Sequence, residues 1–159
     1  FRGRKAAHRI SKAVFKRLAR RHLDPEPRVR LGQALLASGM VQTAIDISDG
    51  VATDLAHICR DSKVGAEVRV MEIPVSRSLK RASRFLGRSP LEFALTGGED
   101  FELLWTVSKK YRSEVQKIAS KILGHMPFQI GRIVRGEGVF LRTSKGAKDI
   151  TYQGYEHCI

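Results

Sequence analysis

The chain has 159 residues, a hydrophobic fraction of 42% and a formal net charge of +13. This length suits one domain with a buried core, and the apolar fraction is well above that of disordered chains. No apolar run approaches the roughly 20 residues of a bilayer-crossing helix, so we expect no membrane span. Because Cys59 and Cys158 lack zinc or redox spacing, we expect idle thiols in a cytoplasmic protein.

The positive charge is concentrated at the start of the chain. Residues 1–31 hold 11 Lys and Arg against 2 Asp and Glu. Such a segment can bind polyanions, or it can form the solvated face of a helix. Because it lacks the interleaved aromatic residues on which bases stack, we do not expect nucleic acid as a partner.

The first predicted element is a helix over residues 4–22, whose apolar residues recur at steps of three and four. Pro25 and Pro27 break it, and we place a boundary there between a basic leader (1–27) and a domain (28–159). The later helices are predicted over residues 29–38, 50–62, 76–86, 89–94 and 110–123.

The predicted strands cover residues 41–47, 66–73, 101–107, 128–135 and 138–142. The strand at 101–107 is apolar on both faces, so we expect it to be central in its sheet. The last two strands are expected to be joined at Gly136 and Glu137. The interleaved helices and strands, with hairpin-like pairs among them, predict an α+β fold in which helices flank a mixed β-sheet.

A first polar junction lies at residues 44–50, where a strand passes into a helix. Strand alternation puts Asp46 and Ser48 on one face, and a carboxylate such as Asp46 at the end of an apolar strand needs cations or donors. These oxygens suit Mg²⁺, and the start of the helix favours a phosphate. The residues are equally typical of a plain helix cap, with Ser48 or Asp49 as N-cap.

A second polar junction lies at residues 96–102, where two glycines and three carboxylates lead into an apolar strand. Gly97 and Gly98 permit a close backbone approach or a positive φ. Taken alone, Glu99 and its acidic neighbours fit a solvated turn. Two acidic strand ends can also converge on one cleft, and the presence of both junctions favours this interpretation.

The motifs in this order resemble the C-terminal domain of thiamine-monophosphate kinases. These kinases belong to a superfamily with aminoimidazole ribonucleotide synthetase, selenophosphate synthetase and a hydrogenase maturation factor. The Gly-Gly-Glu-Asp-aromatic-Glu-Leu form favours the thiamine-phosphate branch. The matching segments are residues 21–28, 44–50, 54–58, 65–66, 73–74, 96–103, 130–133 and 154–157.

The resemblance implies a transfer of the γ-phosphoryl group of ATP to thiamine monophosphate, with Mg²⁺, to give thiamine diphosphate. It assigns Mg²⁺ to Asp46 and to Asp49, ATP to Ser48 and the substrate to Glu99. Phosphoryl transfer depends on positioning and charge neutralisation, so no residue of this chain is expected to act as a general base.

The resemblance also implies an aromatic residue in the substrate pocket near the C-terminus. Here Cys158 stands where an aromatic is expected, and Tyr155 is the nearest replacement.

Members of this family carry an N-terminal domain with most metal ligands, much of the ATP site and the homodimer interface, and the sequence contains no counterpart of it. We therefore expect the chain to be a fragment that is inactive alone. The alternatives are a related enzyme with another phosphate acceptor and a polyanion-binding module that uses the basic leader.

Overall fold

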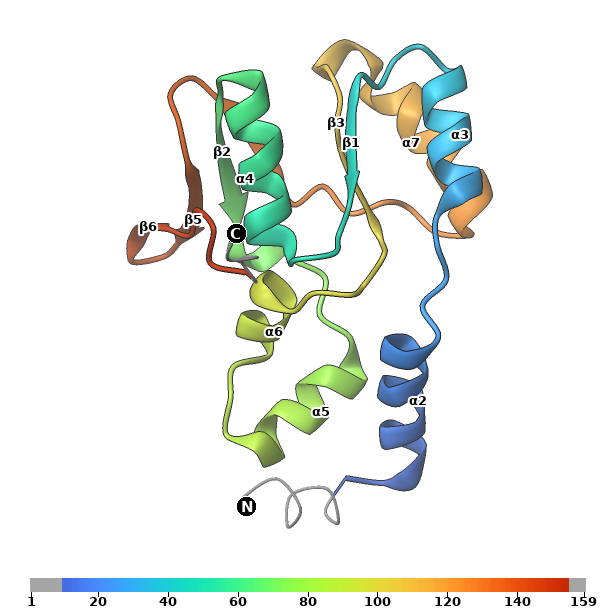
Figure 1. Cartoon of the computed structure of the whole chain (residues 1–159), viewed down its shortest axis with the longest axis vertical. Coiled ribbons are helices and arrows are strands. Elements are labelled where there is room, and N and C mark those ends of the chain that lie inside the picture. The colour runs from blue at the N-terminus through green and yellow to red at the C-terminus, as the bar shows by residue number, and fades with distance from the viewer. Residues whose placement is uncertain (1–9, 155–159) are drawn as a thin grey trace, which may run out of the picture.

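The computed structural model of the chain describes residues 10–154 (Figure 1). The α-helices are α2 (Lys12–Leu23), α3 (Val29–Ala37), α4 (Val51–Ser62), α5 (Arg77–Leu86), α6 (Pro90–Thr96) and α7 (Arg112–Leu123). The strands are β1 (Thr43–Asp46), β2 (Gly65–Arg69), β3 (Leu103–Thr106), β4 (Gly131–Val134), β5 (Val139–Thr143) and β6 (Gly146–Asp149). Short 3₁₀ turns lie at Val70–Glu72 and Lys109–Tyr111. Among the described residues, none of the helices has the length and apolar character of a membrane span.

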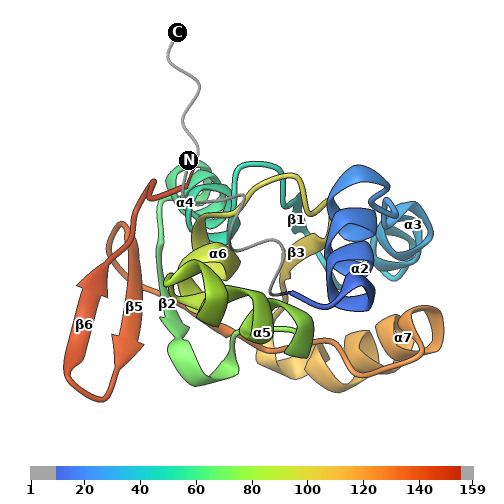
Figure 2. The ribbon, with the colours of Figure 1, turned by 90° about the horizontal axis from the view of Figure 1, so that it is seen from below.

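The sequence predicts one sheet, whereas the strands form two. The larger sheet has the strand order β4-β2-β5-β6, in which β2 runs parallel to β5 and antiparallel to β4. β1 and β3 form a separate antiparallel pair, with Ile45 opposite Leu104. The larger sheet is mixed and helices flank it, so the predicted α+β class is confirmed (Figure 2).

Three details of the sheets differ from the prediction. β3 is not central, because β1 is its one partner among the described strands; its apolar residues instead face the helices and an open cleft. β4 and β5 are not neighbours, because β2 lies between them and buries Ala66 and Val68. β6 is absent from the prediction, since Gly146–Asp149 has no β-branched or aromatic residue to signal a strand.

The main core lies where α4 packs on the larger sheet. α4 buries eight of its twelve residues, and Ala52 and Ala56 are 0% and 2% exposed. These small residues let the helix approach the strands closely. Cys59 belongs to this core as a buried free thiol whose pKa is raised by burial, in line with the predicted idle role, and Cys158 lies outside the described residues.

A second apolar cluster packs α3 and α7 beside the β1–β3 pair (Figure 1). Leu35 of α3 and Val115 and Ala119 of α7 are each at most 1% exposed. α3 ends where Gly39 takes a φ of 65°, in the C′ position that glycine favours. The cluster includes Leu103 and Trp105 of β3, which pairs with β1, and β1 leads directly into the first polar junction.

α2 differs from the other long helices because none of its residues is buried. It begins after Ser11, whose Oγ accepts a hydrogen bond from the Val14 N–H at 3.4 Å. Val14 and Leu18 of its apolar stripe are half-buried, and α5 lies beside it (Figure 2). The start predicted for this helix, at residue 4, lies outside the described residues.

Candidate functional site

The two polar junctions of the sequence meet in the structure. Beyond the end of β1, the Ile47 N–H donates to the Glu102 carbonyl at 2.8 Å, and the Phe101 N–H donates to the Ile47 carbonyl at 2.9 Å. One residue further along, the Glu99 N–H donates to the Ser48 carbonyl at 2.9 Å. The expected convergence of two acidic strand ends is therefore present, and backbone hydrogen bonds hold it together.

Gly98 permits this close approach because it has no side chain. A Cβ atom at Gly98 would lie 2.3 Å from the Ser48 carbonyl oxygen, which is too close for any real contact. The left-handed conformation falls instead on Glu99, with a φ of 62°, and on Phe101, with a φ of 49°. Residues other than glycine adopt it rarely, and such strain persists where surrounding contacts fix the backbone.

The start of α4 corrects the predicted helix cap. The N-cap residue is Gly50, with a φ of 106°, rather than Ser48 or Asp49. The acceptor is a side chain of the helix itself, and the donors lie before the helix. Oδ2 of Asp54 accepts hydrogen bonds from the backbone N–H groups of Ser48, at 3.1 Å, and Asp49, at 3.2 Å. The turn at Gly50 thus places these N–H groups within reach of a carboxylate inside the first turn of the helix.

Asp54 is the site residue that the sequence interpretation does not single out. Its side chain is only 1% exposed. Burial raises the pKa of its carboxyl group, and the N–H groups of Asp49 and Ser48 act in the opposite direction. The available signal is its position, since it is an acidic residue between Thr53 and Leu55 on the buried side of a helix.

An open cleft of about 1790 Å³ lies between the β1–β3 pair and the larger sheet. Ser48, Asp49 and Glu99 are among the residues that line it. Asp46 does not line it, and its side chain is exposed, so the expected cost of burying this carboxylate does not arise. The structure therefore brings three of the predicted site residues to one cleft and leaves Asp46 at its outside.

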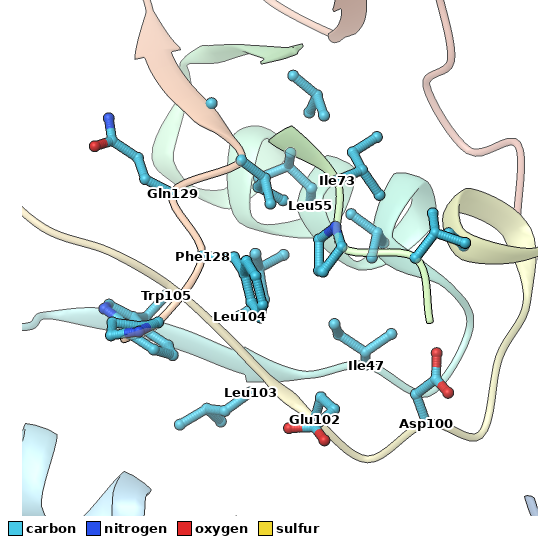
Figure 3. A pocket seen from close by; sticks show the side chains of 18 of the residues that line it. Ile47, Leu55, Ile73, Asp100, Glu102, Leu103, Leu104, Trp105, Phe128 and Gln129 are labelled. Atoms are coloured by element: carbon cyan, nitrogen blue, oxygen red, sulfur yellow. The ribbon is translucent and has the colours of Figure 1, made fainter. Parts of the chain in front are cut away.

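The cleft has an acidic rim, and its walls combine apolar side chains with basic ones such as Arg112 and Arg132. Figure 3 shows Asp100 and Glu102 near Ile47 at this rim, with Phe128 and Leu104 meeting farther inside. Although the Asp100 side chain is partly open to water, the surrounding protein raises the pKa of its carboxyl group, and the charge of Glu102 adds to this. The rim therefore gathers the carboxylates of Glu99, Asp100 and Glu102.

Three basic residues from the start of the chain contact the acidic rim: Arg28, His22 and Arg21, whose Nη1 lies 3.5 Å from Oε1 of Glu102. Arg28 donates to both carboxylate oxygens of Glu102, from Nε at 2.8 Å and from Nη2 at 2.7 Å. The bonds from Arg28 hold the pKa of the Glu102 carboxyl group below its usual value. His22 lies 3.6 Å from Glu99, measured from Nε2 to Oε2, and both side chains are exposed. Glu102 is thus occupied by arginine, whereas Glu99 is open to water.

The C-terminal segment joins the same corner of the molecule. The Gly154 N–H donates to Oγ1 of Thr53 at 2.8 Å, and a Cβ atom at Gly154 would lie 2.2 Å from the Asp49 carbonyl oxygen. Tyr152 meets His57 of α4 edge to face, with ring centroids 5.4 Å apart. Tyr155, the predicted substrate contact, lies outside the described residues.

The oxygen donors of the site suit Mg²⁺, which takes one or two protein carboxylates and completes its shell with water and phosphate oxygens. Within residues 10–154, no three His, Cys, Asp or Glu side chains gather into a metal-binding group. Asp49 and Glu99 line one cleft and can each supply an oxygen ligand. The residues present therefore fit part of a Mg²⁺ site.

Comparison with known proteins extends the resemblance seen in the motifs. The family model for the C-terminal domain of AIR synthase-related proteins matches residues 7–144. The thiamine-monophosphate kinase of Haemophilus influenzae is 37% identical over 145 residues, which are 88% of this chain and 42% of that protein. The crystal structure of thiamine-monophosphate kinase from Stenotrophomonas maltophilia K279a has a TM-score of 0.71 at 37% identity and covers 82% of this chain and 40% of that one.

A further solved structure, AaThiL complexed with AMPPCP and TMP, has a TM-score of 0.69 at 30% identity. The match covers 86% of this chain and 42% of that chain. The chain therefore spans less than half the length of these relatives. Both polar junctions fall inside the segment that the family model matches. The chain belongs to the family of AIR synthase-related proteins, and it corresponds to their C-terminal domain.

Proposed function

We propose that this chain is the C-terminal domain of a kinase that uses ATP and Mg²⁺ to convert thiamine monophosphate to thiamine diphosphate. The observation that carries the proposal is the direct bonding of the two acidic junctions, through the Glu99 N–H and the Ser48 carbonyl. Relatives named thiamine-monophosphate kinase share this part of the chain, and one solved relative is complexed with AMPPCP and TMP.

The acidic residues of the first junction are proposed to hold Mg²⁺. Asp49 lines the cleft, and Asp46 is exposed at the end of β1, where it can reach a metal shared with another part of the enzyme. Bound Mg²⁺ would neutralise the charge that develops on the phosphates during phosphoryl transfer. The role of the chain is to fix these carboxylates, because positioning contributes much of the rate in such reactions.

The remaining roles divide between the nucleotide and the acceptor. Ser48 is proposed to bind ATP, because its hydroxyl can donate to a phosphate oxygen at the start of α4. Glu99 is proposed to contact the substrate: it lines the cleft and is open to water, whereas neighbouring Glu102 is held by arginine. Tyr155 remains the proposed aromatic contact, and its neighbour Gly154 is bonded beside the first junction.

The proposed enzyme is larger than this chain. We infer that an N-terminal domain supplies most metal ligands, much of the ATP site and the homodimer interface, and that the isolated chain is inactive. We also propose a division into a leader, residues 1–27, and a domain, residues 28–159; the family match nevertheless begins at residue 7 and includes α2. A cytoplasmic location fits an enzyme that consumes ATP and holds a reduced thiol at Cys59.

The test is a fusion in which this chain replaces the matching part of the Haemophilus influenzae relative. We expect the fusion to form thiamine diphosphate from thiamine monophosphate and ATP, and the isolated chain to form none. Asp49→Asn in the fusion should lower kcat/KM at least tenfold, because a metal ligand is lost. Glu114→Gln removes an exposed carboxylate of α7 and should leave the rate unchanged.

Two outcomes would contradict the proposal. A soluble, folded fusion without kinase activity would show that this chain cannot serve as the C-terminal domain of such an enzyme. A fusion that phosphorylates another acceptor more efficiently than thiamine monophosphate would instead favour the related enzyme with a different substrate. A panel of phosphorylated acceptors, assayed by ADP release, separates these cases.

A further inference from the structure

We propose that Asp54 is a positioning residue, which holds Ser48 and Asp49 in their working geometry through the backbone N–H groups of both. The inference rests on the proposed function, because it concerns the residues assigned there to ATP and Mg²⁺. It adds a residue that makes no contact with either ligand. Asp54 acts from beneath the site, inside the first turn of α4.

The first argument concerns the cost of placing a carboxylate at this position. The Asp54 side chain is 1% exposed, and no arginine or lysine forms a salt bridge with it among the described residues. A buried acid without a cation is tolerated when hydrogen-bond donors surround it. The donors here are the N–H groups of Ser48 and Asp49, at 3.1 and 3.2 Å from Oδ2. Asp54 and this turn therefore depend on each other.

The second argument concerns what else can fix the turn. Gly50, the N-cap residue, offers no side chain, and its φ of 106° belongs to a conformation that glycine adopts easily. On the carbonyl side, Ser48 is held by the Glu99 N–H. On the N–H side, Asp54 supplies the side-chain acceptor. The turn is thus fixed between the acidic loop on one side and Asp54 on the other.

The consequence is a division of labour along the turn. The backbone of Ser48 and Asp49 is committed to Asp54, so their side chains do not have to hold the turn as helix caps. A Ser or Asp side chain that caps a helix is occupied by backbone N–H groups. Asp54 takes over this structural task, so the backbone sets where the Ser48 and Asp49 side chains lie in the cleft that both residues line.

The test uses the full 159-residue chain with two substitutions at this position. Asp54→Leu has a similar size and no acceptor, whereas Asp54→Asn keeps one oxygen acceptor. Ser83→Ala is the matched control: Ser83 is 1% exposed, lies on α5, and its Oγ has no hydrogen-bond partner among the described residues. Each variant is compared with the parent chain by amide hydrogen exchange, by paramagnetic broadening of amide signals with Mn²⁺, and by thermal unfolding.

We expect the Ser48 and Asp49 amides of Asp54→Leu to exchange at least tenfold faster, while the amides of the last two turns of α4 stay protected. Half-broadening of the Asp49 signal should then need at least tenfold more Mn²⁺. Asp54→Asn should fall between the parent and Asp54→Leu, and Ser83→Ala should match the parent. A purely structural role would instead lower the unfolding temperature without this selective change at the turn.

Three outcomes would overturn the inference. A folded Asp54→Leu chain with parental exchange at Ser48 and Asp49, or with parental Mn²⁺ broadening, removes the positioning role and leaves the proposed function standing. If the parent chain shows no selective broadening at Asp49 and the fusion enzyme is inactive, the proposed function fails and this inference falls with it. If Asp54→Leu does not fold, the same two measurements on Asp54→Asn decide.

Discussion

The helices α2 and α4 have the same length, twelve residues, and both carry an apolar stripe, yet they occupy opposite situations in the molecule. α4 buries eight residues, packs on the larger sheet and sets the geometry of the candidate site. α2 buries none and lies against α5. The comparison shows that helical periodicity identifies the apolar face of a helix. It does not show whether other elements of this chain bury that face.

The difference has a physical basis in the two sequences. α4 has alanines on its buried face, and Ala52 and Ala56 let the strands come close. α2 carries five lysines and arginines and no acid, so its long charged side chains must remain in water. Its links to the site are polar ones at its end: Arg21 lies 3.5 Å from Glu102, and His22 lies 3.6 Å from Glu99. α2 is therefore attached through its C-terminal turn more than through its apolar stripe.

The largest effect is expected from a matched pair of Leu→Ala substitutions, one in each of the two helices. Leu55→Ala in α4 removes a side chain that is 5% exposed, and we expect a loss of about 3 kcal/mol in the free energy of unfolding. Leu18→Ala in α2 removes a half-buried side chain and should cost less than about 1 kcal/mol. Urea unfolding followed by circular dichroism measures both. Equal losses would mean that α2 belongs to the core.

A smaller effect is expected at the link between the two regions. Arg28→Met keeps the length of the side chain but removes both short bonds of Arg28 to the half-exposed Glu102, which keeps its longer contact with Arg21. We expect a loss of about 1 kcal/mol at pH 7, reduced from that of a buried pair because Glu102 can rehydrate. Arg88→Met, in an exposed pair with Glu92, is the control and should cost clearly less than Arg28→Met.

The stabilisation from Arg28 should also depend on pH in a defined direction. Arg28 lowers the pKa of Glu102 in the folded state from the ordinary value of 4.5. A carboxyl group with a lowered folded pKa stabilises the fold above its unfolded pKa and loses this contribution as pH falls through the folded pKa. The difference between parent and Arg28→Met should therefore be constant from pH 7 to about pH 5.5 and shrink below about pH 4.5. A difference that grows on acidification would contradict the assignment.

The sequence predicted the existence and type of most elements, because their signals are local. α4 follows from its apolar face, although its N-cap is Gly50 and not Ser48 or Asp49 as predicted. What periodicity could not show is which strands become neighbours, since pairing is decided by packing across the chain. The residues of β4 and β5 look like a hairpin, yet β2 separates them because its buried apolar side chains, Ala66 and Val68, belong to the core.

For the candidate site, too, the local features were predictable and the contacts between distant residues were not. Acidic residues at two strand ends indicated a shared cleft, and the bond between Glu99 and Ser48 realises this expectation. The burial of Asp54 could be inferred from its place in the helix, but its bonds to Ser48 and Asp49 could not, because they depend on the way in which Gly50 turns the chain back over α4. The exposure of Asp46 could not be predicted from the sequence either, since the burial of an apolar strand such as β1 depends on which elements cover it.

The smallest expected effect tests whether α2 is stabilised independently of the rest. Lys12→Glu places an acid in the first turn of α2, which has none, and should stabilise that helix locally by about 0.5 kcal/mol through the helix dipole. Lys16→Glu makes the same charge change in the second turn, where the dipole effect is weaker, and serves as the control. Because α2 opens separately if its apolar stripe is only half covered, amide exchange in α2 should slow about twofold while the global free energy of unfolding from urea stays constant. A gain of similar size in the global value would show that α2 folds and unfolds together with α4, and the distinction between the two helices would then concern burial alone.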